Sequence, residues 1–260
     1  MSALLEDLAT VRVLWVRDLL RFLRQPSRIV GALGQPIIFW LVLGSGMAST
    51  FRMQGAEQLG YMEYFYPGVI VMVVLFASIF ATVSVIEDKS AGFLQTVLVA
   101  PGSRAALVLG KSLGAATVAL LQAAVFLLLA PWAGFRLGAL DWPLLALALI
   151  ATSLGLTAFG FALAWWLDNI QAYHAIQMTL LVPLWVLSGA MFPASDRHPL
   201  FAAIMRANPL TYATAAIRHA LYGGVAPIAA PPAGTSLLIL LGFCLLCLAV
   251  ASVLCYRKRT

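Results

Sequence analysis

The stretch FYPGVIVMVVLFASIFATVSVI, residues 65–86, contains no Asp, Glu, Lys, Arg or His. A helix that crosses a bilayer needs about 20 mostly apolar residues, so this stretch is long enough to span a membrane. Five more stretches have a similar length and composition, and Lys111 is the one Asp, Glu, Lys, Arg or His in the whole set. The six predicted spans are residues 29–48, 65–86, 105–130, 142–167, 175–191 and 237–256. The sequence therefore predicts an all-α integral membrane protein, a single domain over residues 1–260 with six transmembrane helices.

The composition of the whole chain agrees with membrane insertion. Apolar residues make up 62% of the 260 and charged residues 10%, with a mean hydropathy of +0.96. Soluble domains have roughly 45 to 50% apolar and about 25% charged residues. The net charge is +6, and the arginines lie beside apolar runs, which favours anionic membrane lipids over nucleic acid as partners. Cys244, Cys247 and Cys255 lie in the last apolar run and are interpreted as packing residues, with no metal site.

The distribution of Lys and Arg predicts that both termini are cytoplasmic, because basic residues accumulate on the inner side of a membrane. With this orientation eleven basic residues are inside and five are outside. The inner set is Arg12, Arg17, Arg21, Arg24, Arg28, Lys89, Arg104, Lys111, Arg257, Lys258 and Arg259, and the outer set is Arg52, Arg136, Arg197, Arg206 and Arg218. We expect a multi-pass protein of the inner membrane, in which Lys111 extends to the interface.

Residues 1–25 predict an amphipathic helix in the cytoplasmic interface. An apolar stripe recurs every three or four residues, and a second stripe carries Arg17, Arg21 and Arg24. We expect its arginines to face lipid phosphates. A simpler interpretation is positive-inside anchoring without a further role.

Residues 193–224 are too apolar for a solvated loop and too interrupted for a span. Two short helices that begin at Pro199 and Pro209 are predicted, and the second ends at Gly223. We expect them to re-enter the outer leaflet or to cap its mouth. Pro183 in the fifth span predicts a kink.

Catalytic and nucleotide-binding motifs are missing from the sequence. GKS at residues 110–112 lacks the first glycine of a phosphate-binding loop, because position 105 is alanine. Five spans have no Asp, Glu, Lys, Arg or His, which disfavours proton coupling. Sodium coupling in an ion-coupled secondary transporter stays open, as does an intramembrane enzyme, although Ser153, Asp168, His174 and His198 form no recognisable triad.

Residues 87–111, EDKSAGFLQTVLVAPGSRAALVLGK, connect the second and third predicted spans. Ser90 is expected to cap a short helix over residues 90–101, whose apolar stripe includes Phe93, Leu94 and Leu98 and which ends at Pro101. A simple interfacial turn is the alternative. The spacing of Gly110 and Gly114 predicts a close helix contact.

Three stretches in order resemble ABC-2 type transporter permeases. They are residues 87–111, YFYPGVIVM at residues 64–72 and NPLTYATAAIRHALYGG at residues 208–224. The resemblance implies the permease subunit of an ATP-driven exporter. It implies a dimer, with a second copy or a paralogue, and a separate ABC ATPase subunit that binds ATP and Mg, so that this chain needs no cofactor and is no enzyme. The cargo is expected to be amphipathic, lipid-like or drug-like, or a lipid-linked glycan.

The resemblance also implies roles for individual residues. The short helix would be the coupling helix, and the N-terminal helix, with Arg17, Arg21 and Arg24, would also touch the ATPase. The residues expected in ATPase coupling are Glu87, Gly92, Phe93, Leu94, Leu98, Pro101 and Arg104. Asn208, Pro209 and Tyr212 would belong to the re-entrant segment near the exit. The residues expected along the cargo path are Gln35, Phe39, Phe76, Phe80, Gln177 and Trp185.

Overall fold

The computed structural model describes residues 2–47, 59–100, 102–192, 199–224 and 230–257, and throughout these ranges the regular structure is helical. The α-helices are α1 (Ser2–Leu23), α2 (Pro26–Gly46), α3 (Tyr61–Ser90), α4 (Phe93–Val99), α5 (Arg104–Leu127), α6 (Trp142–Leu167), α7 (Ile170–Trp185), α8 (Pro199–Ala207), α9 (Pro209–Leu221) and α10 (Ala233–Arg257). Short 3-10 turns follow α5 at Ala130–Ala133 and Leu137–Ala139, and a π-turn, Val186–Ala190, follows α7. The prediction of an all-α chain is confirmed for the part described.

Five helical segments of the described chain are long and apolar enough to cross a membrane. They are Tyr61–Ser90, Arg104–Leu127, Trp142–Leu167, Ile170–Ala190 and Ala233–Arg257, whereas Val30–Gly46 is a shorter apolar helix. Five of the six predicted spans thus match long apolar helices, and the bounds of α6 are those predicted. The crossing at residues 29–48 stays a prediction.

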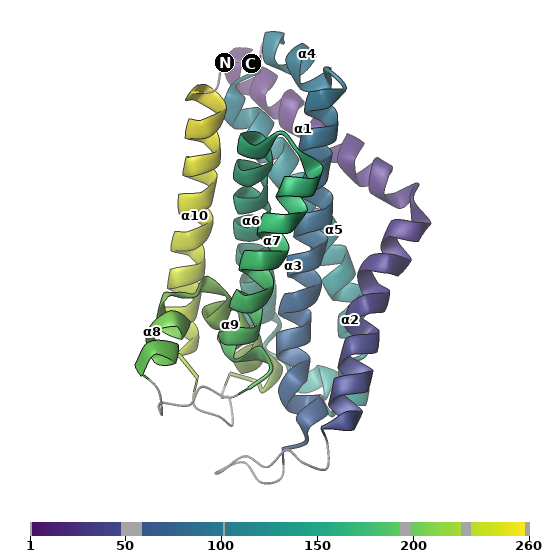
Figure 1. Cartoon of the computed structure of the whole chain (residues 1–260), viewed down its shortest axis with the longest axis vertical. Helices are drawn as coiled ribbons and strands as arrows, with labels where there is room; N and C mark the ends of the chain where they lie inside the picture. The colour runs from purple at the N-terminus through teal and green to yellow at the C-terminus, as the bar shows by residue number, and fades with distance from the viewer. Residues whose placement is uncertain (1, 48–58, 101, 193–198, 225–229, 258–260) are drawn as a thin grey trace.

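Helix α3 occupies the centre of the bundle (Figure 1). It contacts α2, α5, α6, α7 and α9, and it is buried on all sides over most of its 30 residues. A helix that is apolar all round is stable in such a position because every face meets another apolar surface. Helix α10 packs against α6 and α9 at the edge of the bundle.

Polar side chains define where several helices begin. The hydroxyl of Ser103 accepts a hydrogen bond from the Ala106 amide at 3.1 Å, and the Asp141 carboxylate accepts one from Leu144 at 3.0 Å. Asn169 begins α7 in the same way. Such caps satisfy amide donors that have no partner inside the helix.

The two ends of the bundle carry different elements. Helices α1 and α4 and both ends of the chain lie together, while α8 and α9 lie at the opposite end (Figure 1). Two short helices therefore replace a span between α7 and α10, as predicted, and they begin at Pro199 and Pro209. Their re-entry into the membrane and the cytoplasmic location of the termini stay predictions, and residues 193–198 lie outside the described part.

Helix α1 is closely packed against α5. A methyl group added at Gly110 would lie 3.0 Å from the Cβ atom of Leu14, and one added at Gly114 would lie 3.0 Å from the Cβ atom of Asp18. The absence of side chains at these two positions lets the two helices approach closely, which confirms the predicted contact at this glycine pair. Helix α1 is thereby fixed to the bundle along one face, and Leu4, Leu8 and Trp15 stay exposed.

Candidate functional site

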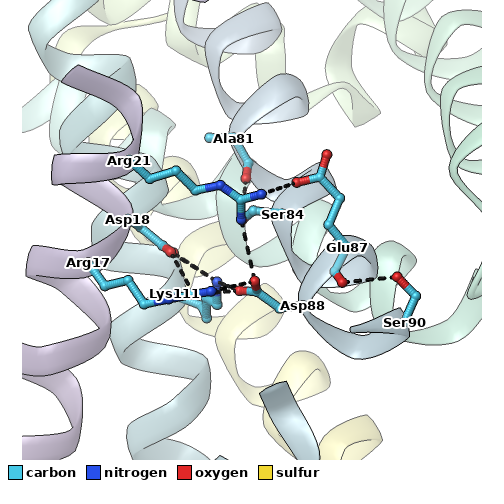
Figure 2. Close-up of polar contacts among 9 residues, drawn as sticks. All are labelled: Arg17, Asp18, Arg21, Ala81, Ser84, Glu87, Asp88, Ser90 and Lys111. Carbon is cyan, nitrogen blue, oxygen red and sulfur yellow. Dashed lines mark hydrogen bonds and ion pairs between the residues drawn. The ribbon is translucent and has the colours of Figure 1, made fainter. Parts of the chain in front are cut away.

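Six charged side chains meet where α1, α3 and α5 converge (Figure 2). We call this set the charge cluster; its members are Arg17, Asp18, Arg21, Glu87, Asp88 and Lys111. Three positive and three negative groups balance one another. Each helix contributes charge, so the cluster connects the N-terminal helix to the base of α4.

Asp88 is the central member of the charge cluster. Its carboxylate accepts two hydrogen bonds of 2.7 Å from the guanidinium of Arg17 and contacts the ammonium group of Lys111. Arg21 lies 3.4 Å from Asp88 and 2.8 Å from the carboxylate of Glu87. Asp88 is 3% exposed, and a carboxylate at such a depth needs cationic partners because burial removes its hydration.

Lys111 is buried, and the prediction that it extends to the interface is wrong. It is 2% exposed, and its ammonium group lies 3.0 and 3.1 Å from the two carboxylate oxygens of Asp18. The adjacent Gly110 packs against α1, which directs Lys111 toward the acids of α1 and α3. Ion pairing inside the bundle replaces the hydration that an interfacial ammonium group would have.

Burial and pairing shift the pKa values of Arg17 and Asp18 in α1. Burial raises the pKa of the Asp18 carboxyl, and the nearby Lys111 ammonium group opposes this effect. The hydrogen bonds with Asp88 raise the pKa of the Arg17 guanidinium, although its partial burial acts in the opposite direction. Arg17 thus stays charged at any physiological pH and holds Asp88 in its carboxylate form.

Arg17 and Arg21 were expected to face lipid phosphates and are instead turned toward α3. Both guanidinium groups are engaged by Glu87 and Asp88, so they are not freely available to lipid or to another subunit. Arg24 is exposed, and its contact with lipid phosphates stays a prediction. The reason is the short separation of α1 from the end of α3, where two adjacent carboxylates attract both arginines.

Helix α4 begins after Gly92, which has a left-handed φ of 75°. The predicted start at Ser90 is wrong, because Ser90 ends α3 and its hydroxyl donates to the carbonyl oxygen of Glu87 at 2.9 Å. Leu94 is 1% exposed and anchors α4 to the bundle, while Leu98 is half-buried. The exposed side chains of α4 are Gln95, Thr96 and Val99.

Phe93 and Arg104 are two further residues that were expected to take part in ATPase coupling. Both contact other helices of this chain. The guanidinium of Arg17 lies 3.8 Å from the centre of the Phe93 ring, which joins α1 to α4. Arg104 donates to the carbonyl oxygens of Cys255 at 2.7 Å and Tyr256 at 3.0 Å, so it caps α10. Leu94 and Arg104 therefore have partners inside this chain, their role in ATPase coupling stays a prediction, and Pro101 lies outside the described residues.

The expected cargo residues are divided between the core and an open crevice. Trp185 is buried and donates to the carbonyl oxygen of Gly68 at 2.8 Å, and the half-buried Phe39 lies against it. Phe76 and Gln177 are also buried. Gln35 and Phe80 line a crevice of about 300 Å³ between α2, α3 and α7, which His174 also lines.

The expected exit residues have structural partners. The Asn208 side chain accepts a hydrogen bond from the Leu210 amide at 3.0 Å and donates one to the Leu184 carbonyl oxygen at 2.6 Å. It therefore both caps α9 and fixes it to α7. Pro209 is the first residue of α9, and the Tyr212 hydroxyl donates to the carbonyl oxygen of Arg206.

The sequence model of the ABC-2 type transporter family matches residues 9–222, which include the charge cluster, α4 and α9. The chain belongs to this family. A transport permease, ycf38, of Cyanophora paradoxa is 27% identical over 79% of this chain and 72% of that protein. The daunorubicin resistance ABC transporter permease protein DrrB1 of Streptomyces coeruleorubidus is 24% identical over 83% of this chain and 75% of its own length. Nodulation protein J of Sinorhizobium fredii is 29% identical over 77% of this chain and 78% of that protein.

Family membership makes this chain a multi-pass membrane permease, a transporter subunit that is not itself catalytic. It also implies that the permease works with an ABC ATPase subunit. The contacts of the GKS residues agree with this division of labour: Gly110 packs on α1, Lys111 pairs with Asp18, and Ser112 is buried. Across the described ranges the permease has no group of three side chains suited to hold a metal ion.

Asp18, Asp88 and Lys111 are functional candidates that were not predicted from the sequence. A signal was present, because Lys111 is the one Asp, Glu, Lys, Arg or His within a predicted span and follows a glycine expected at a helix contact. A buried lysine requires an acidic partner, but the sequence does not distinguish Asp18 and Asp88 from the neighbouring acids Glu6, Asp7 and Glu87.

Proposed function

We propose that this permease exports an amphipathic cargo across the inner membrane, driven by ATP hydrolysis in a separate ABC ATPase subunit that binds ATP and Mg. The observation that carries the proposal is the continuity of α3. Its 30 residues extend from the end of the bundle that holds α8 and α9, past the crevice, to Glu87 and Asp88 at the base of α4. A displacement of α4 is thus transmitted along α3 to the walls of the crevice.

The charge cluster makes the base of α4 stiff. Asp88 connects it to α1 and α5, and Lys89 contacts Asp168 at the end of α6. An ATPase can shift the permease between two states only through contacts that differ between them. A short helix whose base is fixed to several spans converts a push on its tip into motion of those spans.

The surface offered to the ATPase has two parts. Val99 at the tip of α4 is 85% exposed, beside the exposed Gln95 and Thr96. A groove of about 890 Å³ along α1 is lined by apolar side chains and by Arg12 and Arg24, which are exposed. This chemistry fits an ATPase surface with apolar and acidic side chains. Because Leu94 is buried, we propose that the exposed residues of α4 make the coupling contact.

The crevice supports an amphipathic cargo. It combines the Phe80 ring and small apolar residues with the amide of Gln35 and the imidazole of His174. Pockets with an apolar body and a few polar groups bind molecules of the same character. One relative is named for resistance to daunorubicin, which favours a drug-like cargo, and a lipid or a lipid-linked glycan is the further candidate. A second copy or a paralogue would complete the path in a dimer.

The experiment that tests this function is co-purification of the permease with its ATPase, followed by an ATPase assay. We expect Val99→Glu to reduce assembly, because it places a charge on the apolar tip of α4. Leu137→Glu is the matched control, since Leu137 is also an exposed apolar residue but lies in the connection at the other end of α5. Equal assembly of both variants would contradict the proposed docking surface, and absence of any associated ATPase would contradict the function.

A further inference from the structure

The last turn of the α7 segment is broken at Gly189. Residues Val186–Ala190 form a π-turn in which Gly189 has a left-handed φ of 77°. A break of this kind changes the pairing of backbone carbonyl oxygens, and an unpaired carbonyl away from water costs free energy. Gly189 is buried, so its carbonyl oxygen needs donors from other elements.

Two side chains donate to this one oxygen. The Tyr64 hydroxyl of α3 lies 2.8 Å from it, and a guanidinium nitrogen of Arg218 in α9 lies 3.1 Å from it. The guanidinium carbon of Arg218 also lies 4.7 Å from the centre of the Tyr64 ring. Three elements that are distant in sequence thus meet at the carbonyl oxygen of Gly189.

A buried arginine such as Arg218 is an unusual hydrogen-bond donor to a backbone carbonyl oxygen, because a neutral side chain could donate the same bond. It is 5% exposed, and it contacts the carbonyl oxygens of Tyr64 and Gly189 and the Tyr64 side chain, while the Tyr222 hydroxyl also interacts with it electrostatically. A guanidinium that leaves water for such partners is desolvated at a cost that a neutral donor would not have. The cost is consistent with a contact that is made in one state of the transporter and released in another.

The turn has little room to shift gradually. A methyl group added at Gly68 of α3 would lie 2.5 Å from the Cβ atom of Ala190. Trp185, just before the turn, donates to the carbonyl oxygen of Gly68 at 2.8 Å. Closely packed contacts of this kind have discrete arrangements and do not deform continuously.

We infer that Arg218 is a positioning residue of the outer gate: through the carbonyl oxygen of Gly189 it holds the broken end of α7 against α3, and the cargo path opens there when this contact is released. The inference rests on the proposed function for the identity of the path. The contact itself can be tested without cargo or ATPase. Failure of the proposed function would be seen separately, as absence of an associated ATPase.

The test uses Ser188, which lies in the break and is 2% exposed. The S188C variant, with the three native cysteines retained, is placed in lipid nanodiscs and labelled with a water-soluble maleimide, and the labelled positions are read by peptide mass spectrometry. The native cysteines are buried in α10, so their labelling reports general unfolding.

In the S188C background we expect Arg218→Gln to raise the labelling rate at position 188 about tenfold. A factor of ten corresponds to about 1.4 kcal/mol, and hydrogen bonds to charged groups contribute at least that amount. Arg218→Lys retains the positive charge but replaces the planar guanidinium with a compact ammonium group. Its labelling rate at position 188 should lie between those of Arg218 and Arg218→Gln. Arg206→Gln, the same change at an exposed arginine of α8, should leave the rate unchanged.

Two results would overturn the inference. Equal labelling of position 188 with and without Arg218→Gln would show that Arg218 does not hold the break closed. A parallel rise at the native cysteines would show that Arg218 maintains the fold as a whole and has no specific role at this gate.

Discussion

Arg17 and Asp88, 71 positions apart in sequence, are joined by two hydrogen bonds of 2.7 Å between a guanidinium and a buried carboxylate. This bidentate pair fixes the N-terminal helix to the end of α3, directly before α4. Paired geometry of this type is stronger than a single contact and restricts orientation as well as distance. The pair therefore makes α1 and α4 parts of one unit.

Asp88→Asn is expected to lower the free energy of unfolding by about 3 kcal/mol, since it leaves Arg17 and Lys111 without their shared carboxylate. Glu87→Gln is the control, because Glu87 lies in a partly exposed ion pair with Arg21 and should change stability by less than about 1 kcal/mol. Denaturant unfolding in detergent measures both variants. Equal losses would show that Asp88 is not the centre of the charge cluster.

Lys111→Met should be strongly destabilising alone and less so when combined with Asp18→Asn. The single change leaves Asp18 and Asp88 facing each other with fewer cations, whereas the double change restores a balanced cluster. We expect a coupling free energy of about 1 to 2 kcal/mol in a double-mutant cycle. Losses that simply add would contradict the assignment of Lys111 to Asp18.

The features of this fold that could be predicted are those determined by residues close together in the sequence. Five of the spans were predictable because each is a continuous apolar run, and α6 begins at Trp142, directly after the Asp141 cap and before Pro143. The short helices α8 and α9 were predictable from Pro199 and Pro209. The packing of α1 on α5 was indicated by Gly110 and Gly114, since small residues at one helix face permit close approach.

The charge cluster could not be assigned in the same way, because it depends on the rotation of three helices about their axes. Lys111 lies 93 positions from Asp18, and its place near the end of a span is equally compatible with an interfacial side chain. Periodicity correctly identified an apolar side of α4. It could not show that Leu94 contacts the bundle of this chain and that Val99 faces outward.

Gly110→Val is expected to separate α1 from α5 and to cost about 1 to 3 kcal/mol, because the added atoms would meet the Cβ atom of Leu14 and the backbone of Val11. Gly242→Val is the matched control, since a methyl group at Gly242 of α10 would meet no atom within 4 Å. Thermal unfolding measures the difference. If both variants lose a similar amount of stability, the loss comes from replacing glycine within a helix and not from the contact between α1 and α5.

Phe80 and Phe76 lie one turn apart on α3, and we expect Phe80 to contact the cargo and Phe76 to serve packing alone. The variants Phe80→Ala and Phe76→Ala distinguish the two roles. Their rings stack with centroids 6.3 Å apart, but Phe80 is 37% exposed and lines the crevice, whereas Phe76 is 5% exposed. Phe76→Ala should lower the free energy of unfolding by about 3 to 5 kcal/mol, as expected for the loss of a buried ring. Phe80→Ala should cost less stability and should raise the concentration of a lipophilic fluorescent dye that gives half-maximal transport in proteoliposomes. If Phe80→Ala changes stability alone and leaves the dye dependence intact, the crevice between α2, α3 and α7 is not the cargo site.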